Sequence, residues 1–346
     1  MSGEQHHGAA HYNAQVRVDS SAPTRLDLAG GTLDIWPLYL FHEGAVTVNA
    51  ATTLRANCTL SESEDDAWHL RSIDTGTALT ITDLSTAAPR EHRLAVQLLR
   101  FFAPSPLVLV TQSESPLGAG LAGSSALAVA VSAALASWVD IQYEPERFMD
   151  IVMNLEAQVL GVPTGTQDYR PAVYGGVSAI DMGPGGVVRR QLAVDVEELS
   201  RRALVIYTGE SRNSGLNNWE VTKLRLDGDA RVTSIFGEIT AVAQAMAQAV
   251  ETAAWRDVEQ LLSREWELRK QLAPGVTTPQ IDALVACGDE AGARAAKICG
   301  AGGGGCLLFL ADPPDVPALR MALTAAGGRP LETDIDREGL RVTVTQ

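Results

Sequence analysis

The first part of the chain after residue 15 alternates between apolar and polar positions, and β-branched residues are frequent among the apolar ones. This two-residue period is typical of strands that bury one face. Asp74-Thr-Gly76 interrupts one alternating segment and has the composition of a hairpin turn. The pattern predicts strands over residues 16–28, 45–60, 67–82 (as a hairpin) and 107–111, and a short helix over 91–102.

From residue 124 onward, apolar positions recur at helical spacing in several long segments. Thr278 and Pro279 are residue types that favour the N-cap and the first position of a helix. The pattern predicts helix, loop and helix over 124–161, a long helix over 232–272 broken near Trp255, helices over 279–296 and 317–326, and strands within 177–194, 203–208, 306–310 and 340–345. This alternation indicates an α+β protein without internal repeats.

The composition is that of a globular chain long enough for two domains, with 346 residues of which 46% are hydrophobic and 20% are charged. A formal net charge of −15 argues against a nucleic-acid partner. The longest apolar run, around residues 127–136, is too short to cross a membrane, so we expect no membrane partner.

Two further features bear on location. Residues 1–15 hold three of the six histidines and little that could pack, which predicts a flexible tail without a secretion signal. The four cysteines form no CxxC pair. This spacing argues against a zinc site and favours reduced thiols in a cytoplasmic protein.

The most informative motif is Pro116-Leu-Gly-Ala-Gly-Leu-Ala-Gly-Ser-Ser-Ala126, which leads directly into an apolar helical segment. Glycines let a loop turn several backbone N–H groups toward one point, and the following helix adds its free N–H groups and the positive end of its dipole. Such a junction favours an anion, most often a phosphate. We expect Ser124 and Ser125 to cap the helix and one hydroxyl to reach a magnesium ion. The alternative is a turn before a buried helix.

Two more glycine-rich segments lie near the two ends of the chain: Ala22-Pro-Thr-Arg-Leu-Asp-Leu-Ala-Gly-Gly-Thr-Leu-Asp34 and Lys297-Ile-Cys-Gly-Ala-Gly-Gly-Gly-Gly-Cys306. In order and spacing, the three segments resemble the signature set of the GHMP kinases, which include galactokinase, homoserine kinase, mevalonate kinase and phosphomevalonate kinase. The resemblance implies a two-lobed α+β fold, with a ribosomal S5 domain 2-like N-terminal lobe and a ferredoxin-like C-terminal lobe. The implied domains are residues 16–200 and 201–346.

The resemblance also implies that the chain uses ATP and Mg²⁺. It assigns Mg²⁺ to Ser125 and Glu156, although a glutamate at a helix edge is more often only solvated. Ala122 is one residue more than the family pattern holds, which implies a shifted ATP or another nucleotide preference. The implied ATP-binding residues are Pro116, Gly118, Ala119, Gly120, Leu121, Ala122, Gly123, Ser124 and Ser125.

A Gly-x-Gln-Asp stretch that ends at Asp168, followed by the glycine pair 175–176, resembles the sugar kinases of the family. The resemblance makes Asp168 the catalytic carboxylate, which accepts the proton of the attacking hydroxyl or orients it. Arg25 lies in an apolar segment and needs a partner, so we expect it to pair with Asp168 and to stabilise transferred charge. The alternatives are Asp168 as a turn residue, and a structural ion pair of Arg25 with Asp27 or Asp34.

The acceptor substrate is expected at the first glycine-rich segment. In the sugar-kinase members the residue that matches Asp34 binds sugar hydroxyls, and Gly30 and Gly31 would keep the backbone close to the ligand. Gly303 and Gly304 would let the C-terminal lobe approach the substrate in the same way.

A fourth segment, Thr208-Gly-Glu-Ser-Arg-Asn-Ser214, resembles a stretch of the heptose-7-phosphate kinases and of the kinase part of fucokinase. Arg212 is accordingly a candidate for binding a phosphate or several hydroxyls, and its alternative is a solvated turn. Leu33 departs from the heptose-kinase pattern, which leaves the sugar open. Trp36 and Tyr39 could form an apolar wall beside a sugar ring, or belong to the core.

Together these motifs imply an ATP-dependent kinase that phosphorylates a hydroxyl, with the anomeric one favoured, of a sugar or sugar phosphate, as a monomer or homodimer. One alternative is an alcohol kinase of the mevalonate or homoserine type, against which the Gly-x-Gln-Asp and Thr-Gly-x-x-Arg segments argue. Another is a sugar sensor without catalysis, against which Ser125, Asp168 and Arg25 argue.

Overall fold

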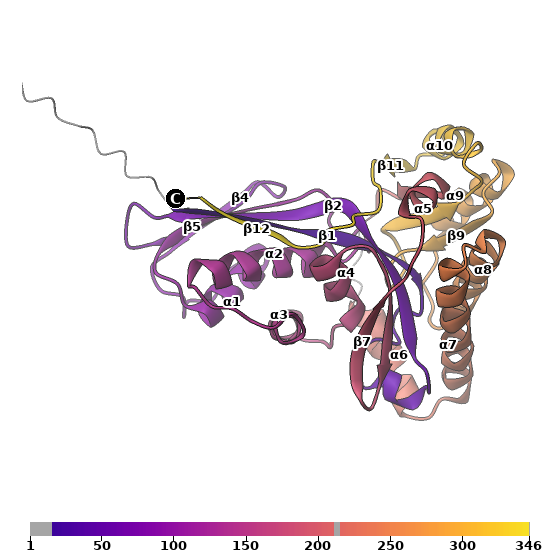
Figure 1. The fold of residues 1–346 in the computed structure, drawn as a ribbon, viewed down its shortest axis with the longest axis horizontal. Helices are drawn as coiled ribbons and strands as arrows, with labels where there is room; N and C mark the ends of the chain where they lie inside the picture. The colour runs from indigo at the N-terminus through magenta and orange to yellow at the C-terminus, as the bar shows by residue number, and fades with distance from the viewer. Residues whose placement is uncertain (1–15, 211–214, 346) are drawn as a thin grey trace, which may run out of the picture.

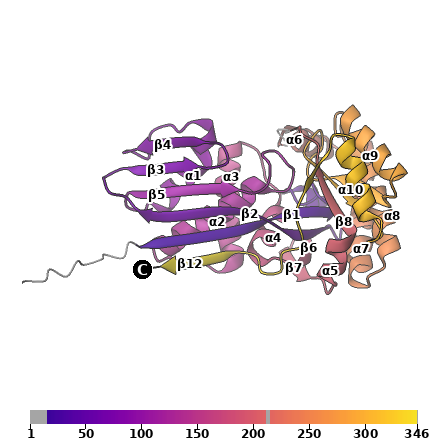
Figure 2. The ribbon, with the colours of Figure 1, turned by 90° about the horizontal axis from the view of Figure 1, so that it is seen from above.

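A computed structural model describes residues 16–210 and 215–345. The predicted tail over residues 1–15 and the candidate residue Arg212 lie outside these ranges. The described chain folds into two sheets, each with helices packed against it (Figure 1). Seen from above, the indigo and magenta N-terminal elements and the orange and yellow helices of the C-terminal part lie at opposite ends of the molecule (Figure 2).

The first sheet is built on two long strands, β1 (Arg17–Ala29) and β2 (Val46–Glu62), which pair antiparallel over most of their length. Its other strands are β3 (Trp68–Ser72), β4 (Thr77–Ile81), β5 (Leu107–Ser113), β6 (Val177–Gly183), β7 (Gly186–Gln191) and β12 (Arg341–Thr345). In the described part of the chain this makes eight strands, ordered β12-β1-β2-β5-β3-β4, with β6 pairing to β2 and β7 to β6. Because β2 is long, its two ends pair with different strands, β5 and β6.

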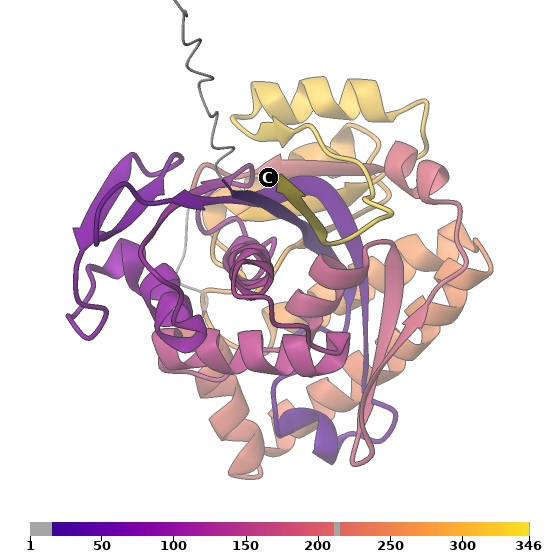
Figure 3. The ribbon, with the colours of Figure 1, turned by 60° about the vertical axis from the view of Figure 1, so that its left-hand side comes forward.

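Four helices belong to the N-terminal half: α1 (Arg93–Phe102), α2 (Gly123–Trp138), α3 (Pro145–Leu160) and α4 (Tyr169–Tyr174). Helix α2 is apolar on all sides, as a helix enclosed by other elements should be. It packs against β1, β2, α1 and α3, and the indigo strands arch over these magenta helices (Figure 3). The residues that lead into α2 lie close to β1, and Ser124 in its first turn is exposed.

The second sheet is antiparallel and contains β8 (Ala203–Tyr207), β9 (Ala295–Ile298), β10 (Cys306–Leu310) and β11 (Arg329–Leu331), in the order β11-β8-β10-β9. Alternate residues face opposite sides, and both sides are buried. Leu204 and Phe309 belong to one apolar cluster with α9 and α10, whereas Val205 and Leu308 belong to the cluster shared with β1 and β2.

The helices of this half are α5 (Val196–Arg202), α6 (Gly215–Leu226), α7 (Ala230–Glu251), α8 (Trp255–Lys270), α9 (Pro279–Glu290) and α10 (Val316–Ala325). Three short 3-10 turns complete the described chain: η1 (Leu38–Phe41), η2 (Arg90–His92) and η3 (Thr166–Asp168).

Most elements expected from the sequence are confirmed, including the break at Trp255, where α8 begins. Thr278 caps α9 by accepting a hydrogen bond from the Ile281 N–H at 3.3 Å. The expected helix over 279–296 is wrong at its end, because residues 295–298 form β9, whose pairing with β10 overrides the helical pattern. The short elements α4, α5, α6 and β11 were not expected.

The C-terminal segment returns to the first sheet, where β12 pairs with β1 from Arg17 to Ser21. The second sheet begins with β8 at Ala203, just after the predicted boundary near residue 200, which stays a prediction. Within residues 16–210 and 215–345, no helix combines the length and the apolar character needed to cross a bilayer.

Candidate active site

The three glycine-rich segments meet at one place, backbone against backbone. The Cys306 N–H donates to the Ala119 carbonyl at 2.8 Å, and the Arg25 N–H donates to the Leu121 carbonyl at 3.0 Å. A Cβ added to Gly305 would lie 2.8 Å from the Ala119 oxygen. The segments from the two ends of the chain thus both touch the loop before α2, and glycine permits the closest of these approaches.

The loop before α2 leaves the helix N-terminus open. Ala122 occupies the N-cap position in a left-handed conformation, with φ of 60°, and no side chain caps the helix. The expectation that Ser124 and Ser125 cap α2 is therefore wrong, because both lie inside its first turn. The first N–H groups of a helix have no partner within it, so this end presents donors and a positive dipole to an anion.

Glu156, on α3, lies against this helix end and is only 2% exposed, so it is not the solvated glutamate of the alternative interpretation. Its Oε1 accepts a hydrogen bond from the Ser124 hydroxyl at 2.6 Å, and its Oε2 accepts one from the Tyr169 hydroxyl at 2.7 Å. Burial raises the pKa of Glu156, although hydrogen bonds from Ser124, Tyr169 and Ser125 oppose the shift. Tyr169, which the sequence did not single out, directly follows Asp168 and thus links Glu156 to the segment that carries Asp168.

Asp168 pairs with Arg25, as expected. Its Oδ1 accepts from the Arg25 Nε at 3.0 Å and from Nη2 at 2.6 Å, and the third guanidinium nitrogen donates to the Gly120 carbonyl at 2.7 Å. The Arg25 side chain is 4% exposed, whereas the Asp168 side chain is 23% exposed. One arginine therefore fixes the accessible carboxylate relative to the glycine-rich loop.

Asp34 lies beside this pair. Its Oδ2 accepts the Gln167 N–H at 2.9 Å, and a Cβ at Gly165 would overlap its carboxylate. Burial, reinforced by the charge of Asp168, raises the pKa of Asp34 to about 7. Leu33 is fully buried in an apolar cluster with α7 and α8, so its departure from the heptose-kinase pattern concerns packing.

A buried cluster of four charges underlies the first segment, and sequence reasoning missed it. Lys297 Nζ lies 3.1 Å from Asp27 Oδ1 and 3.1 Å from Glu265 Oε2. Arg269 lies 3.3 Å from Asp27 and 3.0 Å from Glu265. Asp27 thus has its ion pairs within this cluster, whereas Arg25 pairs with Asp168. The four-residue spacing of Glu265 and Arg269 on one helix was a signal that could have found half of it.

The remaining candidates lie around the third segment. Gly303 donates its N–H to the Val276 carbonyl at 2.7 Å, and a Cβ on Gly304 would approach the Glu210 carbonyl to 3.0 Å. Their role toward a substrate stays a prediction, as does that of Arg212, which lies outside the described residues.

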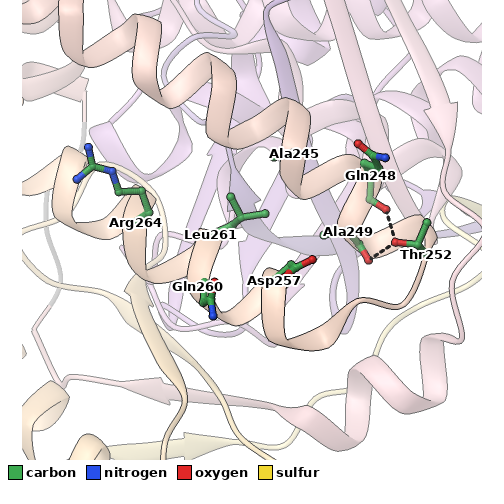
Figure 4. A pocket seen from close by; sticks show the side chains of 8 residues that line it. All are labelled: Ala245, Gln248, Ala249, Thr252, Asp257, Gln260, Leu261 and Arg264. Carbon is green, nitrogen blue, oxygen red and sulfur yellow. Dashed lines mark hydrogen bonds between the residues drawn. The ribbon is translucent and has the colours of Figure 1, made fainter.

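A pocket of about 550 Å³ lies elsewhere, between α7 and α8 (Figure 4). Thr252, which lines the pocket, donates its hydroxyl to the carbonyls of Gln248 and Ala249 at 2.9 and 3.4 Å. The hydroxyl is therefore hydrogen-bonded to the last turn of α7. None of the expected site residues lines this pocket.

The oxygen ligands at the loop fit Mg²⁺ carried by a phosphate. Within the described ranges, no group of three or more His, Cys, Asp or Glu side chains could hold a metal by itself. Mg²⁺, however, is usually held by one or two carboxylates together with phosphate oxygens. The Glu156 carboxylate and the neighbouring serine hydroxyls offer such a set next to the open end of α2.

Comparisons with known proteins agree with this arrangement. Two family models match the chain, GHMP kinases N terminal domain over residues 92–176 and GHMP kinases C terminal over residues 246–328. The D-glycero-alpha-D-manno-heptose 7-phosphate kinase of Campylobacter jejuni is 26% identical over 94% of this chain and 98% of its own length. The mevalonate kinase of Pyrococcus abyssi is 31% identical over 66% of this chain and 67% of its own length.

A solved structure has the same fold. The D-glycero-D-manno-heptose 1-phosphate kinase from Bacteriodes thetaiotaomicron matches with a TM-score of 0.76 at 21% identity, over 95% of this chain and 99% of that one. The chain belongs to the GHMP kinases. It has the two-lobed α+β fold of that family and is a kinase, and GHMP kinases use ATP as the phosphate donor, generally with Mg²⁺.

Proposed function

We propose that this protein transfers the γ-phosphoryl group of ATP to a hydroxyl, the anomeric one being favoured, of a sugar or sugar phosphate. The observation that carries the proposal is that one guanidinium, that of Arg25, donates hydrogen bonds both to the Asp168 carboxylate and to the Gly120 carbonyl. It holds an accessible carboxylate at a fixed distance from the loop that would bind the phosphates.

In this mechanism the residues 116–125 cradle ATP with their backbone N–H groups at the open end of α2. Asp168 accepts the proton of the acceptor hydroxyl or orients it, and Arg25 holds that carboxylate in place and stabilises transferred charge. Ser125 and Glu156 would hold Mg²⁺, which would supply positive charge to balance that of the phosphates.

Asp34 is the proposed contact to the acceptor, together with the backbone of Gly30 and Gly31. A buried carboxylate with one oxygen held by the Gln167 N–H can accept further hydrogen bonds from neighbouring hydroxyls, which suits a polyol. Trp36, which is 64% exposed two residues away, could cover the face of a sugar ring. The similarity to a heptose 7-phosphate kinase supports the same substrate class.

The second candidate is an alcohol kinase of the mevalonate type, favoured by the 31% identity to an archaeal mevalonate kinase. The two are separated by assaying ADP release with Mg·ATP against sugars, sugar 1- and 7-phosphates, mevalonate and homoserine. The proposal expects one sugar or sugar phosphate to exceed mevalonate and homoserine in kcat/KM by at least about a hundredfold. Preference for mevalonate would overturn it, and so would the absence of turnover with every acceptor. NMR of the product identifies the phosphorylated hydroxyl.

A further inference from the structure

The four-charge cluster of Asp27, Glu265, Arg269 and Lys297 joins the two halves of the molecule. Asp27 lies on β1, Glu265 and Arg269 on α8, and Lys297 on β9. None of the four side chains is more than 5% exposed, and their formal charges sum to zero. Because burying unpaired charge is costly, removal of any one member leaves an uncompensated charge inside the protein.

The segment Gly30–Gly31 rests directly on this cluster. The Gly30 N–H donates to Glu265 Oε1 at 3.1 Å, and Gly30 has a φ of +85°. A Cβ on Gly31 would overlap both the Arg269 Nη2 and the Asp27 Oδ2. Three residues later the same segment carries Asp34, so the position of Asp34 depends on where the glycines are held.

We propose that Glu265 is a positioning residue for phosphoryl transfer, through its hydrogen bond to the Gly30 N–H. The C-terminal half thereby sets where the Asp34 segment lies against Asp168, although Glu265 itself is fully buried. Arg269 and Lys297 pair with Glu265 and Asp27, and these contacts hold the buried Glu265 carboxylate against that N–H. The inference rests on the proposed function in one respect, the assignment of Asp34 to the acceptor.

Loss of the hydrogen bond should affect the acceptor and leave ATP unaffected. The Gly30 N–H contact lies on the Asp34 side of β1, whereas the loop before α2 is held by Arg25 and Cys306. If Glu265 had a purely structural role, its loss would lower the stability of the protein. The fraction that still folds would then keep the wild-type KM for the acceptor and the wild-type KM for ATP. The KM for the acceptor, compared with the KM for ATP, is therefore the informative measurement.

Two charge-balanced double variants differ in whether residue 265 presents an oxygen to the Gly30 N–H and to the Arg269 Nε, which both donate to Glu265 Oε1. Glu265→Met with Lys297→Met removes one anion and one cation and leaves the Asp27–Arg269 pair, but it gives Gly30 no acceptor. Glu265→Gln with Lys297→Met has the same charge and nearly the same volume, and it still presents an amide oxygen to Gly30. Both are measured in the full chain, with thermal unfolding and ATP binding recorded beside the kinetics.

We expect the Met/Met variant to raise the acceptor KM about tenfold or more, with the ATP KM within about twofold, and the Gln/Met variant to stay within about threefold of wild type. Equal acceptor KM values in the two variants would overturn the inference. If the Met/Met variant does not fold, the Gln/Met variant decides. A Gln/Met variant that unfolds at the wild-type temperature but has a tenfold higher KM for the acceptor would also overturn the inference.

Two controls complete the design. Asp34→Asn tests the proposed function separately: if it leaves the acceptor KM unchanged, the acceptor assignment fails, whereas a change in Asp34→Asn without one in the Glu265 variants overturns only the inference. Arg55→Met with Asp336→Asn disrupts another buried ion pair, between β2 and the segment before β12. It should lower stability and leave the acceptor KM unchanged.

Discussion

Two ion pairs on strand β1, two residues apart, differ in what they leave open to solvent. Arg25 reaches Asp168, whose side chain is 23% exposed, whereas Asp27 lies in a cluster whose members are at most 5% exposed. Both are buried arginine or lysine contacts to carboxylates, and their distances are similar. Both regions contain buried ion pairs, so pairing does not distinguish them. Solvent access to the carboxylate does: Asp168 is accessible and therefore suited to catalysis, whereas the buried cluster of Asp27 holds the two halves together.

The largest effect should come from the accessible carboxylate. Asp168→Asn keeps the shape of the side chain but cannot accept a proton, so we expect kcat to fall roughly 10²–10⁴-fold with ATP binding and folding retained. The measurement is turnover with the best acceptor, beside ATP titration and thermal unfolding. Turnover within about threefold of wild type would show that another group does this work.

Changes in the buried four-charge cluster should lower the stability of the protein rather than its turnover. Lys297→Met leaves two buried carboxylates with one arginine, so we expect a loss of about 3–5 kcal/mol in the free energy of unfolding. Urea titration measures it. Arg17→Met serves as the matched control, since it removes an exposed partner of Asp19 on the same strand and should change little. Similar losses in both variants would abolish the contrast between the regions.

Asp34 should give the protein a distinctive pH dependence. Its folded pKa is raised from 3.8 to about 7, chiefly by burial, so the neutral form is favoured in the folded state. The stability that this contributes is fully present below about pH 4 and is lost as the pH rises to about 7. Relative to wild type, Asp34→Asn should therefore gain up to roughly 4 kcal/mol between pH 4 and pH 8. Parallel unfolding curves across this range would contradict the buried, shifted carboxylate.

The smallest effect concerns Glu156, which is sealed from solvent like the cluster but lies beside the proposed phosphate site. Ser124→Ala removes its 2.6 Å hydrogen bond, and we expect the KM for Mg·ATP to rise roughly tenfold without loss of helix content, because Ser124 is not a cap. Ser125→Ala should raise the same KM and shift the Mg²⁺ dependence. If circular dichroism shows that the Ser124 variant loses the helix α2, then Ser124 does cap that helix and this prediction is wrong.

The candidate site could be predicted from the sequence only where a residue lies within a motif. The glycine spacings led to Arg25, Asp34 and Asp168, which the structure brings together. Tyr169 and Glu265 were missed because they lie outside those motifs. The four-residue spacing indicates Arg269 as a partner of Glu265, but one sequence carries no signal of the distant partners, Gly30 for Glu265 and Glu156 for Tyr169. Glu156 was singled out, yet its burial depends on α2, α3 and α4 packing together.

By itself, the sequence determined the elements whose residues favour them locally: the alternating strands, the break at Trp255 and the Thr278 cap, because hydrophobic period and capping act within a few residues. The tertiary structure alone decided that residues 295–298 form β9, that β12 returns to β1 and that Asp27 pairs with Lys297. It also decided between the partners that the sequence left open for Arg25, in favour of Asp168. Strand β9 depends on its neighbour β10, and the other outcomes depend on partners more than a hundred residues away. A buried charge or an unpaired strand edge takes whichever partner the fold brings within reach.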